Sequence, residues 1–173
     1  SNNMKPEIKE RLPQWYKNLD FTYSIIGSDD IDYLASKYVL KELFSCDIDL
    51  FFDFRTMYIK EGIDINKLER DRIIGVDLDL AKNKCFSNHV TYIKNPDTIS
   101  LNRNISYLTR NSYFKKFAGS TLLTIMSLYD IDISNMTEQQ LEILICVDTA
   151  FKQYYFNKDL FTYYYNEVLE YPE

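Results

Sequence analysis

Histidine, paired cysteines and long apolar runs are all scarce in this chain of 173 residues. The single histidine, His89, excludes any mechanism that needs two imidazole groups. The three cysteines are far apart and form no CxxC pair, so the sequence predicts neither a zinc site nor a disulfide framework. No run of 18 apolar residues and no signal peptide is found, so we expect a cytoplasmic protein without a membrane span.

Basic residues are also in the minority, with 20 Lys and Arg against 26 Asp and Glu, which gives a formal net charge of −6. Binding to long duplex nucleic acid through charge alone requires clustered Lys and Arg, so we do not expect such a partner. The balance is compatible with a site that binds cations first and phosphates second. Hydrophobic residues make up 46% of the chain and charged residues 27%, which indicates a globular protein of one domain.

Apolar, strand-like runs alternate with helical spacing in the first part of the chain. Four strands are predicted, at residues 21–26, 47–54, 73–80 and 89–93. Helices are predicted after the first strand, with Ser28 or Asp29 as the N-cap, and at residues 65–72. This alternation is typical of a parallel, doubly wound α/β sheet of about four to five strands flanked by helices.

The second half of the chain is predicted to be helical. One helix is expected over residues 115–130, and the next begins at a capping box formed by Thr137 and Gln140. An aromatic-rich segment at 159–171 follows. We expect a single domain over residues 1–173 with a core of about 21–155.

Acidic residues stand where two of the predicted strands end. They are Asp29, Asp30 and Asp32 after the first strand and Asp77 and Asp79 at the end of the third. His89 stands at the start of the predicted fourth strand. Ligands of an open parallel sheet bind beyond the carboxyl ends of its strands, so these side chains are expected to converge at one edge.

Two interpretations of these acids are open. Acidic residues in the first turn of a helix are favoured by its dipole, by about 0.3–1 kcal/mol each, so Asp30 and Asp32 could simply cap a helix. Capping does not explain Asp77, in an apolar strand, or Asp148, in an apolar helix, because burying an unpaired carboxylate is unfavourable. A divalent metal explains all four together with His89, and oxygen ligands with one imidazole suit Mn²⁺ or Mg²⁺. Such ions can activate a water for phosphoester hydrolysis.

Five segments of the chain, taken in order, resemble the motifs of the DHH phosphoesterases. They are SDDIDYLASKYVL for the first motif, GVDLDL for the second, FSNHV for the Asp-His-His signature, YFKKFAGSTLLTIMSLY for a small-Ser-Thr helix start and LICVDTAF for the last motif. The resemblance covers roughly residues 21–155 and is to the N-terminal domain of RecJ-like and nanoRNase-type members.

The resemblance implies a metal site holding one or two Mn²⁺ or Mg²⁺ ions, at which activated water attacks phosphorus. The metal ligands that it implies are Asp30, Asp32, Asp77, His89 and Asp148. Asp77 and His89 are the implied catalytic residues, with Asp77 bridging the ions. The implied substrate-binding residues are Ser28, Asn88 and Ser120. The expected substrate is a small phosphorylated molecule or a short single-stranded oligonucleotide.

The chain departs from the family pattern at three points. Ser28 stands in the position of the first-motif histidine, and only Asn88 and His89 remain of the Asp-His-His signature. The family's C-terminal substrate-binding domain is expected to be absent. Two functions are therefore open: metal-dependent hydrolysis of a phosphodiester or phosphomonoester, and a non-catalytic domain that binds a nucleotide or a protein partner.

Overall fold

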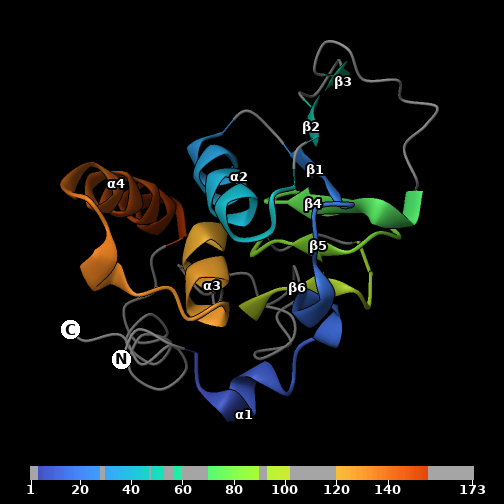
Figure 1. Ribbon diagram of the computed structural model, residues 1–173, viewed down its shortest axis with the longest axis horizontal. Helices are drawn as coiled ribbons and strands as arrows, with labels where there is room; N and C mark the ends of the chain where they lie inside the picture. Colours follow the sequence, from blue (N-terminus) through green and yellow to red (C-terminus); the bar gives the residue numbers. More distant parts are fainter. Residues whose placement is uncertain are drawn as a thin grey trace.

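Six strands form one sheet in the order β3-β2-β1-β4-β5-β6 (Figure 1). The computed structural model describes residues 4–27, 30–46, 48–52, 57–59, 70–89, 93–101 and 120–155. The strands are β1 (Ser24–Gly27), β2 (Ile48–Phe52), β3 (Met57–Ile59), β4 (Ile73–Val76), β5 (Cys85–Phe86) and β6 (Thr98–Ile99). All neighbours pair in parallel except β2 and β3, which are antiparallel. The predicted α/β fold with a parallel sheet is therefore confirmed.

The order of the strands reverses at β1. This strand pairs with β2 on one side and with β4 on the other, and Ser24 is in register with both Ile48 and Ile73. The chain therefore moves outward from β1 in one direction and later returns to build the sheet in the other. In such sheets the crevice beyond the carboxyl ends of the two central strands is the usual ligand site.

The strands are short, apolar and buried at the centre of the sheet. The side chains of Ile25, Ile74, Val76, Phe86 and Ile99 are fully buried. Continuous apolar runs of this kind are expected in a parallel sheet covered on both faces, because no side chain along the strand faces water.

Three helices lie together beside the sheet (Figure 1). They are α2 (Ile31–Phe44), α3 (Thr121–Leu128) and α4 (Glu138–Tyr155). Every residue of α3 is buried, including its hydroxyl-bearing residues, so this short helix forms the centre of the helical layer. Within the described part of the chain, no helix is both long and apolar enough to cross a bilayer.

The N-terminal segment packs against both α3 and the sheet. It contains α1 (Pro6–Lys9) and a 3₁₀ helix at Gln14–Asn18. The indole of Trp15 lies edge-on to Phe86, with ring centroids 4.8 Å apart, and its Nε1–H donates to the carbonyl of Asp97 at 2.8 Å. The backbone N–H of Met4 donates to Ser127 O at 3.0 Å, which joins the start of the described chain to α3.

Gly27 closes β1 directly beneath the ring of Tyr33. A Cβ atom at position 27 would overlap several ring atoms of Tyr33, and the Tyr33 side chain is fully buried. Glycine is therefore the residue that lets the first turn of α2 fold down onto the end of β1.

Several predicted boundaries are corrected by the structure. Of the strand predicted at 89–93, residues 90–92 lie outside the described part of the chain, and two strands that were not predicted, β5 and β6, lie on either side of it. The strand predicted at 73–80 ends at Val76, because Asp77 adopts a left-handed φ of 55° that leaves the extended conformation. The N-cap of α2 is Asp30, not Ser28 or Asp29.

Two predicted helices and the aromatic-rich segment lie partly or wholly outside the described residues. Of the helix predicted at 65–72, the described part is a 3₁₀ turn at Arg70–Arg72. The helix predicted over 115–130 is described from residue 121, and the segment 159–171 lies outside the description.

The predicted capping box at the start of α4 is confirmed. The backbone N–H of Gln140 donates to Thr137 Oγ1 at 3.2 Å, and the N–H of Thr137 donates to Gln140 Oε1 at 2.9 Å. The substitution Thr137→Ala removes the cap and should lower the free energy of unfolding by about 1 kcal/mol, measured by urea denaturation. Gln139→Ala, at an exposed position of the same turn, is the control and should change it much less. Equal effects of the two substitutions would contradict the role of the box.

Candidate metal centre

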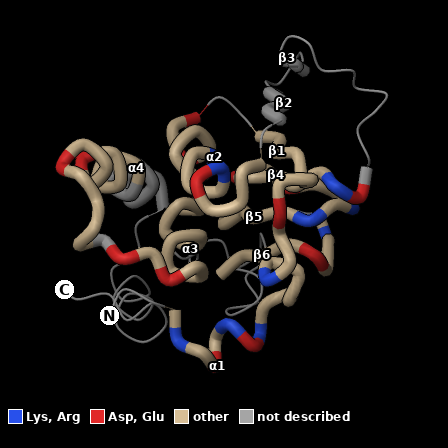
Figure 2. Tube along the Cα trace, viewed as in Figure 1, with Lys and Arg blue, Asp and Glu red and all other residues tan. Residues whose placement is uncertain are grey.

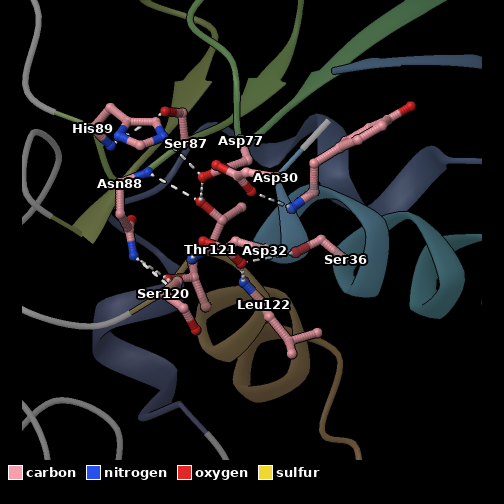
Figure 3. Close-up of polar contacts among 12 residues, drawn as sticks. Asp30, Asp32, Ser36, Asp77, Ser87, Asn88, His89, Ser120, Thr121 and Leu122 are labelled. Atoms are coloured by element: carbon pink, nitrogen blue, oxygen red, sulfur yellow. Dashed lines mark hydrogen bonds and ion pairs between the residues drawn. The ribbon is translucent and has the colours of Figure 1, made fainter. Parts of the chain in front are cut away.

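The two strands that flank the reversal of strand order are each followed by a carboxylate. Asp77 comes directly after β4, and Asp30 comes three residues after the end of β1. Figure 3 shows their carboxylates facing each other, with the His89 ring beside Asp77. One ligand atom from each of Asp30, Asp77 and His89 lies within 4.8 Å of the others. The convergence expected from the sequence therefore occurs for these three residues.

Asp77 is the buried centre of this cluster, with 3% of its surface exposed. Its N–H donates to Phe86 O at 2.8 Å, which fixes the left-handed backbone. Its Oδ1 accepts a hydrogen bond from Thr121 Oγ1 at 2.8 Å and lies 3.0 Å from His89 Nε2. Its Oδ2 is buried and has no hydrogen-bond partner among the described residues. Buried polar atoms are nearly always paired, so this oxygen points to a ligand.

Asp30 begins α2 and also faces Asp77. Its Oδ1 accepts from the backbone N–H of Tyr33 at 3.0 Å, so the capping interpretation of this residue is correct. Loss of solvation, the charge of Asp77 and a hydrogen bond shared with that carboxyl raise the pKa of Asp30 to about 6. Asp30 therefore caps α2 and also belongs to the ligand cluster.

The histidine is the third member of the cluster and contacts Asp77. His89 is half-buried, and its backbone N–H donates to Ser87 Oγ at 3.2 Å. Burial alone would raise the pKa of Asp77, but the hydrogen bond and the charge of His89, helped by the hydroxyl of Thr121, hold it below its usual value. Asp77 is therefore the ionised member of the cluster, and Asp30 carries the proton more readily.

Asp32 is placed beside the cluster but is engaged elsewhere. Its Oδ2 accepts from the N–H of Thr121 at 3.0 Å, and its Oδ1 accepts from the N–H of Leu122 at 2.9 Å. Ser36 Oγ donates to the same Oδ1 at 3.3 Å. Burial and the nearby charge of Asp77 raise the pKa of Asp32 well above its usual range. Asp32 is not among the three residues whose ligand atoms converge.

Two residues predicted to bind substrate form part of the framework. Asn88 Nδ2 donates to Thr124 Oγ1 at 2.7 Å and to Ser120 O at 3.1 Å, and Asn88 Oδ1 accepts from the N–H of Leu101 at 3.2 Å. Ser120 Oγ caps α3 by accepting from the N–H of Leu123 at 3.1 Å. Both side chains are buried. Their contacts hold α3 against the ends of β5 and β6.

Two further predicted site residues lie wholly or partly outside the described part of the chain. Ser28 lies outside the described residues, and Asp148 lies in α4 with its side chain outside the description. A residue that sequence reasoning missed is Thr121, which contacts both Asp32 and Asp77. The signal for this residue is the Gly-Ser-Thr motif before α3, in which Thr121 follows the predicted Ser120.

Charge is distributed unevenly between the two ends of the sheet. Arg72, just before β4, and Lys84, just before β5, lie over the ring of Tyr23, 4.9 Å and 5.7 Å from its centroid. Figure 2 shows basic and acidic residues together near the start of β4. The carboxyl ends of β1 and β4, in contrast, carry Asp30 and Asp77. This edge is therefore suited to a cation.

An apolar groove of about 740 Å³ lies between α2 and α4. Exposed Ile31, Leu34 and Tyr38 of α2 and Ile143 of α4 are among its lining residues. None of the three clustered residues lines it, so the groove and the acidic cluster are different features of the surface.

Comparison of the chain with models of protein families, with characterised proteins and with solved structures gave no match. The resemblance to DHH phosphoesterases therefore stays a prediction from the sequence motifs.

The raised pKa of Asp30 has a consequence for stability. Between about pH 4 and pH 6 the folded chain holds a proton on Asp30 that the unfolded chain has released. The contribution of this group to the free energy of unfolding should therefore fall as the pH rises through that window. Urea denaturation with EDTA from pH 4 to pH 7 should show a shallower decline for Asp30→Asn than for the wild type. Asp97→Asn, at an exposed position, should keep the wild-type slope, and identical slopes for all three proteins would contradict this prediction.

Proposed function

We propose that this chain is a phosphoesterase that requires a divalent cation and acts on a small phosphorylated substrate, such as a nucleotide or a short single-stranded oligonucleotide. The observation that carries the proposal is the buried Oδ2 of Asp77, which has no hydrogen-bond partner in the described part of the chain and belongs to a cluster with Asp30 and His89. A ligand atom from each of these three residues lies within 4.8 Å of the others.

The donor set fits Mn²⁺ or Mg²⁺ better than zinc. Two carboxylates and one imidazole converge, and the carboxylates are hard oxygen ligands. At neutral pH both acids are mainly ionised, given a pKa of about 6 for Asp30, so they repel each other unless a cation lies between them. A divalent ion would offset the repulsion between the two carboxylates.

Asp30, Asp77 and His89 would hold the ion, which when bound supplies Lewis acidity and lowers the pKa of a coordinated water. Asp77, buried and hydrogen-bonded through Oδ1, provides the fixed arm of the site. Asp30 is exposed, and His89 is half-buried, so the cluster is open to solvent on their side. A phosphorylated substrate can approach from that direction.

Charge supports a phosphorylated substrate bound through a cation. The described acids at this edge would repel a phosphate, and the net charge of −6 gives no general attraction for anions. Binding of a divalent ion neutralises the two carboxylates and gives phosphate oxygens a cation to contact at the same edge. This order of binding also disfavours long duplex nucleic acid, which needs an extended basic surface.

A second candidate function is binding of a nucleotide without hydrolysis. The observation that favours it is the engagement of Asp32 with α3, which leaves three converging ligands among the described residues. Such a site could still join a phosphate to the protein through one cation.

The substitution Asp77→Asn tests the proposal, because it keeps the shape of the side chain and removes its charge. We expect wild-type protein to bind Mn²⁺ in isothermal titration calorimetry and to hydrolyse bis(4-nitrophenyl) phosphate. Asp77→Asn should weaken Mn²⁺ binding by more than about 100-fold, since loss of a ligand exceeds the usual effect of an outer contact, and should abolish turnover. Asp97→Asn makes the same change of charge at an exposed position and should leave both unchanged.

Three results separate the two functions. Turnover that depends on Mn²⁺ and on Asp77 supports hydrolysis. Binding of Mn²⁺ and of a nucleotide, detected by a shift in melting temperature, without turnover supports the second function. Absence of Mn²⁺ binding by the wild type, or equal binding by Asp77→Asn, would contradict both.

A further inference from the structure

The first turn of α3 is held by a residue of another helix. The N–H groups of Thr121 and Leu122 donate to the two oxygens of Asp32, while the next N–H, of Leu123, donates to Ser120 Oγ. The N–H groups at the start of a helix have no partner within it, and a carboxylate there is favoured by the helix dipole. Asp32 therefore completes the capping of α3, although it belongs to the first turn of α2.

Thr121 connects this cap to the candidate metal centre. Its backbone N–H is bound by Asp32, and its side-chain hydroxyl donates to Asp77 Oδ1 at 2.8 Å. Figure 3 shows Thr121 in contact with both carboxylates. The position of the hydroxyl thus depends on where Asp32 holds the end of the helix.

The Thr121 hydroxyl also determines which oxygen of the Asp77 carboxylate has no hydrogen bond among the described residues. Thr121 and His89 both contact Oδ1, and Oδ2 is the buried oxygen without a partner in the described part of the chain. Fixing one oxygen of a carboxylate sets the direction of the other, as outer contacts do in metal sites.

We propose that Asp32 is a positioning residue rather than a metal ligand, and that it acts through Thr121 to direct Asp77 Oδ2 at the ion. This inference rests on the proposed function, because it assigns roles around the same cation. It differs from the ligand set implied by the sequence motifs, in which Asp32 contacts the metal itself.

Thr121→Val tests the step between the cap and Asp77. It removes the hydroxyl and keeps the backbone N–H that Asp32 binds, so Mn²⁺ binding should weaken by about 10- to 100-fold, the range for lost outer contacts. Thr121→Ser restores a hydroxyl and should recover most of the affinity. The matched control is Thr124→Val, one turn further along α3, which removes a buried hydroxyl that contacts Asn88 but not Asp77. It should lower the melting temperature and leave the Mn²⁺ dissociation constant within about twofold of the wild type.

The role of Asp32 itself is tested with a double-mutant cycle, read from Mn²⁺ binding followed by electron paramagnetic resonance. If Asp32 acts through Thr121, Asp32→Asn and Thr121→Val should weaken binding to a similar extent, and the double variant should be no weaker than either. A ligand behaves differently: its loss should multiply with the loss of the Thr121 hydroxyl, as we expect for Asp30→Asn combined with Thr121→Val.

The outcomes distinguish the inference from the function on which it rests. If the wild type binds no Mn²⁺, both are wrong. If the wild type binds Mn²⁺ and the effects of Asp32→Asn and Thr121→Val multiply, the positioning role is wrong and the proposed function stands. Should Asp32→Asn fail to fold, the comparison of Thr121→Val with Thr124→Val decides, and equal dissociation constants for those two variants overturn the inference.

Discussion

The carboxylate of Asp32 is buried between two helices, and the arrangement around it depends on how its charge is satisfied. A buried carboxylate without partners is strongly unfavourable, whereas the N-terminus of α3 offers two N–H groups that also lack partners within their own helix. The N–H groups stabilise the carboxylate, and the carboxylate supplies the acceptors that the start of α3 lacks. Their contact sets α2 against α3, and because α3 is buried on all sides, it also sets α3 against the ends of the strands.

Three carboxylates crowd into this region and differ because their surroundings differ. Asp32 is bound by backbone N–H groups, Asp77 by a hydroxyl and an imidazole, and Asp30 by one N–H at a solvent-exposed helix start. The pKa of Asp30 is raised and that of Asp77 lowered, so the pair is separated in acidity although the two groups face each other. Divergent surroundings of paired acids are typical of functional sites, where each group has its own task.

The sequence predicted the part of the site that follows from sheet geometry. Parallel strands end at the same edge, so acids within a few residues of the ends of two strands, such as Asp30 and Asp77, were expected at that edge, and the pairing of β1 with β4 brings them together. Local signals were equally informative at Thr137, where the capping box needs only residues three apart.

Contacts between distant parts of the chain could not be predicted from local sequence patterns. Asp32 and Thr121 are 89 positions apart, and nothing in either neighbourhood indicates that a carboxylate of one helix caps another. The strands β5 and β6 have two residues each, too few to give a period of alternation, so no pattern predicts them. The position of His89 next to Asp77 depends on β5, which ends three residues before it.

The packing of Tyr33 over Gly27 bears on how this site can change in evolution. The two positions share one volume at the end of β1, and neither can grow without displacing the other. Among sequences that retain the site, positions 27 and 33 should therefore covary, with any larger residue at 27 matched by a smaller one at 33. A pair of substitutions linked in this way would identify relatives of the chain even where the acidic motifs have drifted.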